Sequence, residues 1–170
     1  MAPPPVCPVP TPTPTCVYLS SQPGMVAKPM TRADGSVDLF VWECKVPGLK
    51  GTVCEGGVFP CTVKFSPEHP HKPPYVSMPM GFFHVNVFPD GGVCLSILKE
   101  VVPGHLGDVS AWRPNFTITT ILVAIQELLS NPNFGSLANK EVYHLKKRSP
   151  SDYVQRMKEQ TAKYTPRDDE

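Results

Sequence analysis

The first half of the chain alternates apolar and polar residues in short segments, a pattern that predicts β-strands. Val, Phe and Trp recur within these segments, and Gly, Pro and Asp separate them. The connections are short, such as the turn signal Asp34-Gly35, and this favours antiparallel pairing of successive strands. Pro60 predicts an edge or a bulge in the third strand. The expected strands are 25–28, 37–46, 58–65 and 75–78.

The second half of the chain has the period of helices. Between 117 and 129 apolar residues recur at intervals of three and four, which predicts a helix whose apolar stripe covers the sheet. The Asn-Pro-Asn sequence at 131–133 should end this helix. A second helix is expected over 137–147, capped by Ser136, and a third from Pro150 to about 164. Strands followed by helices indicate an α+β fold.

Length and composition fit one domain flanked by tails. A chain of 170 residues, of which 41% are apolar, can bury one core, which we expect to span 24–165. Residues 1–23 alternate Pro with small residues, which excludes a helix and predicts a disordered or polyproline II tail. Binding to an SH3-type groove is the alternative use of this segment. Residues 166–170 are expected to form a short polar tail.

Charge and cysteine content disfavour several classes of function. The net charge of +1 provides no overall attraction to nucleic acid, and no apolar run approaches the ~20 residues of a membrane span. The N-terminal sequence lacks the layout of a signal peptide. The six cysteines include no Cys-x-x-Cys pair, and the five histidines complete no zinc-ligand spacing. We therefore expect no metal and a reduced, intracellular protein.

Candidate chemistry centres on Cys94, which stands between a Gly-Gly turn and an apolar run. A deprotonated thiol is a strong nucleophile, and an Asn side chain can donate to an oxyanion without changing its charge. Asn86 precedes Cys94 closely enough that a bend folding it over the thiol would supply the parts for acyl transfer. The alternative is a cysteine buried for structural reasons. A Cys-His hydrolase is disfavoured, because the sequence shows no histidine with an orienting acid for Cys94.

The segment around Cys94 resembles the active-site segment of ubiquitin-conjugating (E2) enzymes. The resemblance is carried by His84-Val85-Asn86, the Pro-Asp-Gly turn at 89–91 and Val-Cys-Leu-Ser-Ile-Leu at 93–98, in that order. It extends over about 24–165. Further motifs are similar to the SUMO-conjugating branch of this family. These motifs are Trp42-Glu43-Cys44, 47–52, 55–57, 112–114, 125–129 and 132–133.

The resemblance implies the fold of that family. This is the α+β ubiquitin-conjugating-enzyme fold, a four-stranded antiparallel meander packed against a central helix and followed by C-terminal helices. The family's fold also opens with an amphipathic helix. We expect that helix to be absent here, because residues 1–23 are rich in proline.

The resemblance also implies an activity and partners. Cys94 would accept SUMO from the SUMO-activating enzyme as a thioester and pass it to lysines of target proteins, with SUMO ligases as further partners. Asn86 would stabilise the oxyanion, or else tie down the bend by bonding to the main chain. His84 matches a structural histidine that orders the loop, and Val85 replaces a proline, which should loosen the loop modestly. No cofactor is implied, nor any contact with nucleic acid or membrane, and the implied location is the nucleus and cytoplasm.

The expected substrate groove departs from the family pattern. Ser136 replaces an Asp that helps to orient the attacking amine, which predicts slower transfer to lysine. Phe88 matches a groove tyrosine but lacks the hydroxyl, and Tyr143 matches a groove aromatic or else faces the core. Asp90 replaces a serine where the SUMO branch reads an acidic target residue, and would repel that residue. Other replaced positions in this region are Tyr75, Ser77 and Gly92.

Several alternatives stay open at this point. The loop 99–111 is longer than the family pattern and either contacts substrates or is a tolerated surface insertion. The basic residues at 146–148 either form a solvated helix end, favoured by the helix dipole, or bind a partner. A non-catalytic variant that binds a modifier or ligase as a scaffold, and an enzyme that conjugates ubiquitin itself, are the alternative functions.

Overall fold

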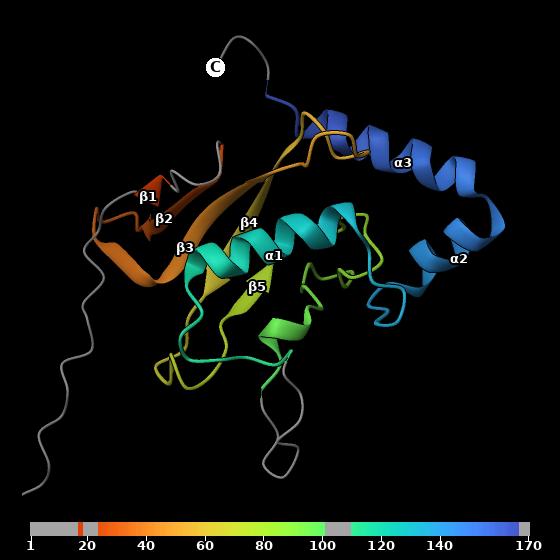
Figure 1. The fold of residues 1–170 in the computed structure, drawn as a ribbon. Helices are drawn as coiled ribbons and strands as arrows, with labels where there is room; N and C mark the ends of the chain where they lie inside the picture. Colours follow the sequence, from red (N-terminus) through yellow and green to blue (C-terminus); the bar gives the residue numbers. More distant parts are fainter. Residues whose placement is uncertain (1–16, 19–23, 101–109, 167–170) are drawn as a thin grey trace, which may run out of the picture.

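The structure, a computed structural model, describes residues 17–18, 24–100 and 110–166. Its centre is a five-stranded antiparallel sheet whose strands follow one another in chain order (Figure 1). The strands are β1 (Val17–Tyr18), β2 (Val26–Thr31), β3 (Val37–Pro47), β4 (Val58–Lys64) and β5 (Tyr75–Ser77). The helices are the 3-10 helix η1 (Ser96–Leu98), α1 (Ile118–Ser130), α2 (Lys140–Arg148) and α3 (Pro150–Lys163).

Strands β2 to β5 confirm the predicted meander, and the helices that follow them confirm the α+β class. Pro60 lies where a sheet tolerates proline. Strand β5 pairs only with Thr62–Lys64 of β4, so at Pro60 strand β4 has a partner strand, β3, on one side alone. The missing N–H of Pro60 therefore interrupts no ladder with β5.

Strand β1 was not predicted. Val17 and Tyr18 pair with Ala27 and Val26 of β2, so these two residues belong to the sheet and not to the tail in which the sequence pattern placed them. Val and Tyr favour strands, and the edge of β2 offers main-chain donors and acceptors to them. The rest of the predicted tail (1–16 and 19–23), where the family's first helix was expected to be missing, lies outside the described residues. So do most of the longer loop (101–109) and the last residues (167–170).

The core lies between one face of the sheet and α1, which crosses that face (Figure 1). Strand residues two apart and helix residues three or four apart supply it, as the two periods in the sequence predict. The β3 and β4 side chains that face this core are Trp42, Cys44, Val46, Phe59, Cys61 and Val63. The α1 side chains in it are Ile121, Leu122, Ile125 and Leu129.

Helix α2 begins later than predicted. Its N-cap is Asn139, whose side chain accepts a hydrogen bond from the Val142 N–H at 3.2 Å. The prediction that Ser136 caps this helix is wrong, because both its hydroxyl and its carbonyl are engaged elsewhere, as described below. The ends of α1 agree with the prediction, and Thr117 caps it. The extent of α3 agrees as well, although Ser149 makes no side-chain capping bond there.

Helix α3 is tied to the segment before the candidate cysteine. The Gln160 side chain accepts a hydrogen bond from the Phe83 N–H at 2.5 Å and donates to the Phe83 carbonyl at 3.1 Å. Gln160 is only 8% exposed, so this reciprocal pair is shielded from water.

The described residues contain neither a candidate membrane span nor a candidate metal site. No helix among them is long and apolar enough to cross a membrane. Within the same residues no group of three or more His, Cys, Asp or Glu side chains could hold a metal ion.

Candidate active site

The segment before Cys94 is a tight turn held against β5. The Met78 N–H donates to the Gly91 carbonyl at 2.9 Å, and the Val93 N–H donates to the Val76 carbonyl at 3.0 Å. Gly91 has a φ of +98°, and a Cβ at this position would overlap the carbonyl oxygen of Met78. Only glycine fits both conditions, so the turn that presents Cys94 depends on it.

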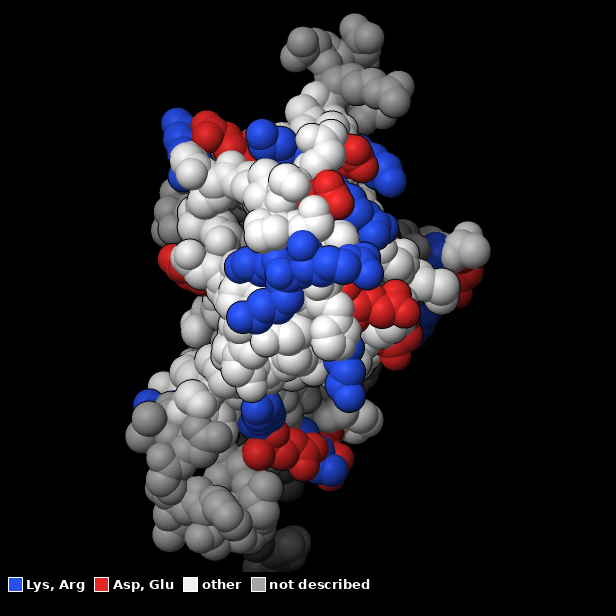
Figure 2. All heavy atoms as spheres, turned by 90° about the vertical axis from the view of Figure 1, so that its right-hand side faces the viewer, with Lys and Arg blue, Asp and Glu red and all other residues white. Residues whose placement is uncertain are grey.

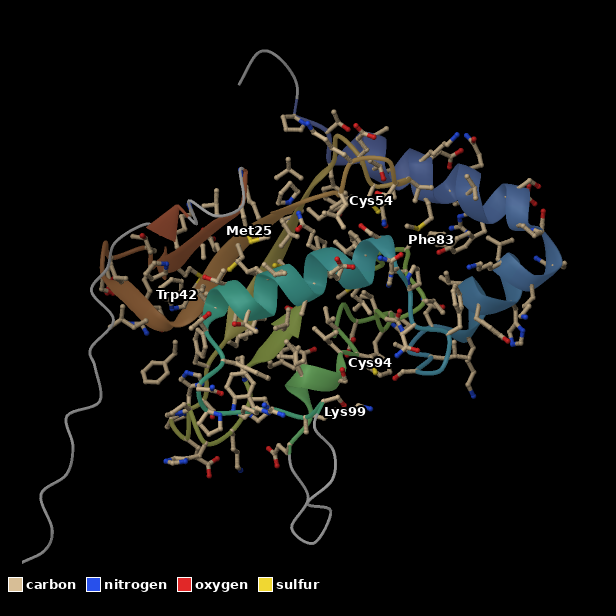
Figure 3. The ribbon with its side chains drawn as sticks, in the orientation of Figure 1. Met25, Trp42, Cys54, Phe83, Cys94 and Lys99 are labelled. Atoms are coloured by element: carbon tan, nitrogen blue, oxygen red, sulfur yellow. The ribbon has the colours of Figure 1, made fainter. Side chains whose placement is uncertain are left out.

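Cys94 is partly exposed, unlike the other cysteines that the structure describes. Its N–H donates to the Asn86 carbonyl at 2.8 Å, and its Sγ lies 3.1 Å from the Oγ of Ser136. Figure 3 shows Cys94 near the connection between α1 and α2, with Cys54 on the other side of α1. The exposure of Cys94 disfavours the alternative of a cysteine buried for packing.

Cys54 and Cys61, two of the buried cysteines, are poor nucleophiles. Burial raises the pKa of the Cys54 thiol to about 11. The pKa of Cys61 is also raised, first by its hydrogen bond with the Cys44 thiol and then by burial. These thiols therefore stay protonated near neutral pH.

Asn86 is completely buried, and every hydrogen-bonding group of its side chain has a main-chain partner. Its Oδ1 accepts from the Asn133 N–H at 2.8 Å. Its Nδ2 donates to the Asn133 carbonyl at 2.7 Å and to the Ser136 carbonyl at 2.6 Å. Both amide hydrogens are therefore engaged, and an oxyanion at Cys94 could receive one only after a bond to the main chain breaks. The contacts match the second role considered for Asn86, tying down the bend; the oxyanion role stays a prediction.

His84 is buried inside the same turn. Its Nδ1 accepts a hydrogen bond from the Asn86 N–H at 3.1 Å, and among the described residues its Nε2 has no hydrogen-bond partner of regular geometry. Burial lowers the pKa of His84 to about 4, and the Leu128 main chain opposes this shift only in part. His84 is therefore neutral at pH 7 and faces the core rather than the thiol, which suits a structural histidine and not a base.

The connection between α1 and α2 forms the opposite wall of the site. The Val85 carbonyl accepts two hydrogen bonds, from the Ala138 N–H at 2.9 Å and the Asn139 N–H at 3.0 Å. Together with the Asn86 contacts, these bonds hold 131–139 against the cysteine loop. The resemblance singles out Ser136 and the 132–133 motif, but the local pattern predicts Asn133 only as part of a helix stop and not as a main-chain partner of Asn86.

Comparisons with known proteins identify the family of this chain. The sequence profile of the family described as ubiquitin-conjugating enzyme matches residues 18–161. A SUMO-conjugating enzyme of Arabidopsis thaliana is 48% identical over 141 residues, which is 83% of each chain. One from Dictyostelium discoideum is 43% identical over 143 residues, covering 84% of this chain and 85% of the relative. One from Caenorhabditis elegans is 38% identical over 141 residues, covering 83% and 80%. This chain belongs to the ubiquitin-conjugating enzyme family.

The predicted groove residues of this conjugating enzyme lie on two sides of Cys94. Phe88 and Asp90 stand in the turn that precedes it, where the Phe88 N–H donates to the Gly92 carbonyl at 2.8 Å. Ser136 is on the other side, in contact with the thiol. Tyr143 is further along, on α2, partly buried, with its ring 6.3 Å from that of Phe134. The structure thus brings Asn86, Ser136 and Cys94 together directly.

The basic end of α2 lies beyond Tyr143 in this family member. Figure 2 shows Lys and Arg side chains gathered on the face that α2 and α3 share. Lys146 stands over the ring of Phe134 at 3.6 Å, and Lys147 lies 5.7 Å from the ring of Tyr143. The aromatic rings and the helix dipole both favour cations at this position, so the basic cluster does not require a binding partner to explain it.

Proposed function

We propose that this chain is a SUMO-conjugating enzyme. Cys94 accepts the C-terminal glycyl group of SUMO as a thioester from the SUMO-activating enzyme and transfers it to lysines of target proteins. The observation that carries the proposal is the partly exposed Cys94 within a chain that matches SUMO-conjugating enzymes over more than four fifths of its length. These relatives favour SUMO over ubiquitin, and the intact thiol favours an enzyme over a scaffold.

The chemistry consists of two acyl transfers. In the first, the Cys94 sulfur attacks the activated carbonyl and the thiol of the activating enzyme leaves. In the second, a lysine amine attacks the thioester, a C–N bond forms, the C–S bond breaks and Cys94 leaves as a thiolate. A thioester suits this role because it yields readily to amines.

The described residues position the thioester but provide no evident base. His84 is buried and held by Asn86, so it cannot reach an incoming amine. Ser136 has a hydroxyl but no charge where the family pattern has an acid. The amine must therefore lose its proton with the help of desolvation when the target covers Cys94, because desolvation lowers the pKa of a lysine. Loading of SUMO onto Cys94 should therefore be better preserved than its discharge to lysine.

SUMO ligases as partners and a location in nucleus and cytoplasm are part of the proposal. Both rest on the resemblance to the SUMO branch. Imaging of a fluorescently tagged chain tests the location, and a signal confined to the extracellular space or to organelles other than the nucleus contradicts it.

The decisive experiment is a thioester assay. The purified chain is incubated with ATP and either the SUMO-activating enzyme with SUMO or the ubiquitin-activating enzyme with ubiquitin. We expect an adduct with SUMO that disappears on thiol treatment and is absent from Cys94→Ala, while the buried Cys54→Ala serves as the matched control and still loads. An adduct with ubiquitin alone supports the ubiquitin alternative, and no adduct with either supports the scaffold.

A further inference from the structure

Three side chains converge on the backbone of Gly92, two residues before the nucleophile. Gly92 has no side chain, and the position that a Cβ would take lies 2.9 Å from the hydroxyl oxygen of Tyr75. The same position lies 3.3 Å from Oδ1 of Asp90 and 3.5 Å from a ring carbon of Phe88. A hydroxyl, a carboxylate and an aromatic ring therefore meet at one point, from β5 and from the turn.

These groups face solvent and have few partners. Tyr75 is 52% exposed, Phe88 is 43% exposed and Asp90 is exposed as well. The Asp90 Oδ1 accepts a hydrogen bond from the Gly92 N–H at 2.9 Å, which holds the carboxylate in place. Asp90 takes part in none of the ion pairs between the described residues. A fixed carboxylate beside exposed aromatic rings suits a Lys or Arg side chain, through charge attraction and cation–π contact.

The three side chains lie close enough to Cys94 to contact a target that reacts there. Gly92 pairs with Ser77 and Val93 pairs with Val87, so the backbone leading to Cys94 is extended. Residues two apart in an extended segment point to the same side and lie about 7 Å apart. An extended target segment that runs alongside 92–94 with its lysine at Cys94 therefore brings a residue about two positions from that lysine over Gly92.

We propose that Tyr75, Phe88 and Asp90 form a recognition site for a cationic target side chain, Lys or Arg, about two residues from the acceptor lysine. The inference rests on the proposed transfer from Cys94 and adds a substrate preference to it. The preference has the opposite sign to the acidic one that the resemblance implies for the SUMO branch. Asp90 attracts a cation where a basic or hydroxyl group would attract an acid.

The test uses target peptides with a single lysine and Arg, Gln or Glu two positions after it, and a second set with the variable residue two positions before it. The chain is loaded with SUMO on Cys94, the activating enzyme is quenched, and discharge to each peptide is followed in a single turnover. In one of the sets the Arg peptide should react about tenfold faster than the Glu peptide, with Gln between them. Added salt should reduce this contrast, because the site is exposed.

Matched variants separate the charge of Asp90 from its shape. Asp90→Asn keeps the acceptor for the Gly92 N–H and removes the charge, so the Arg preference should disappear. Asp34 accepts from the Ser36 N–H at 2.9 Å in the β2–β3 turn, in the same geometry, so Asp34→Asn is the control and should keep the preference. Equal rates for the three peptides in both sets, a faster Glu peptide, or a preference that survives Asp90→Asn would overturn the proposal.

A binding measurement separates this inference from the proposed function. The isotope-labelled, unloaded chain is titrated with the Arg and Glu peptides, and the Gly92 amide is followed by NMR. The Arg peptide should shift this signal at millimolar concentration and the Glu peptide should not, whether or not any thioester forms. Absence of a SUMO thioester refutes the proposed function, and absence of an Arg-dependent shift refutes the recognition site.

Discussion

The side chain of Asn86 and the main chain of Asn133 form a reciprocal pair of hydrogen bonds, 2.8 Å in one direction and 2.7 Å in the other. This pair joins the cysteine loop to the connection between α1 and α2, two segments far apart in the sequence. The same amide also holds the Ser136 carbonyl, and the Ser136 hydroxyl contacts the thiol of Cys94. One buried side chain thus sets the position of a residue beside the nucleophile.

Replacing Asn86 should cost stability as well as activity. Asn86→Ala leaves the Asn133 N–H and two carbonyls without partners, and we expect the free energy of unfolding to fall by about 3 kcal/mol. Urea denaturation followed by circular dichroism measures this change.

Two further variants sharpen the interpretation of Asn86. Asn86→Asp keeps the shape of the side chain and the oxygen that accepts from the Asn133 N–H. It replaces the Nδ2 group, which donates to two carbonyls, with an oxygen that repels them, so it should destabilise the chain at least as much as Asn86→Ala. Asn133→Ala removes only the side-chain bond to the Gly135 N–H and should have a smaller effect. An Asn86→Ala variant of unchanged stability and slow discharge would instead support the oxyanion role.

Adding a charge at Ser136 should speed the second transfer. Ser136→Asp places a carboxylate near the attacking amine while the main-chain bond to Asn86 can persist, and we expect discharge of the Cys94 thioester to free lysine to rise about tenfold, or 1.4 kcal/mol. The rate is read from loss of the thioester band in a chase. Ser151→Asp, on the exposed first turn of α3, is the control for charge alone. Equal discharge from both variants contradicts the prediction.

Stability should fall as pH is lowered through the range set by His84. The pKa of His84 is about 4 in the folded chain and about 6.5 when unfolded, so below pH 6.5 the unfolded state binds more protons. The contribution of neutral His84 to the free energy of unfolding is fully present above pH 6.5 and is lost progressively toward pH 4. The loss is about 2 kcal/mol at pH 5.

Urea denaturation at pH 7.5 and pH 5 measures this loss. Burial also lowers the pKa of His69, which adds a contribution of the same sign. His84→Gln removes the titrating group and should reduce the pH dependence, although it also lowers stability at both pH values. A pH dependence that is unaltered in this variant would exclude His84 as the cause.

Breaking the bond between α3 and the cysteine loop should also destabilise the chain. Gln160→Ala removes both hydrogen bonds to the Phe83 main chain, with an expected loss of about 2 kcal/mol. Gln155→Ala, which removes only an exposed side-chain bond to Glu159 on the same helix, is the control. Thermal denaturation compares the two, and similar melting temperatures would show that the Gln160 contacts contribute little.

Local patterns predicted most of the elements. The four main strands and α1 follow from periods of two and 3.6, because each element buries one face and the alternation of side chains is set by the backbone itself. The predictions failed where local preference was weak or was overridden. Strand β1 forms because the edge of β2 is open to pairing. Ser136 does not cap α2, because its carbonyl is bonded to Asn86 and its hydroxyl contacts the thiol of Cys94.

That Cys94 follows a glycine turn with Asn86 and His84 upstream can be read from the chain alone, since this arrangement is local. What each of these residues does there depends on contacts that form only when the chain folds. Whether the Asn86 amide is free or engaged, and whether His84 faces the thiol or the core, depends on the docking of 131–139 and of α1. The convergence of Tyr75, Phe88 and Asp90 over Gly92 likewise arises from the pairing of β5 with the turn. Such contacts join residues far apart in the chain, and single-residue preferences carry no information about them.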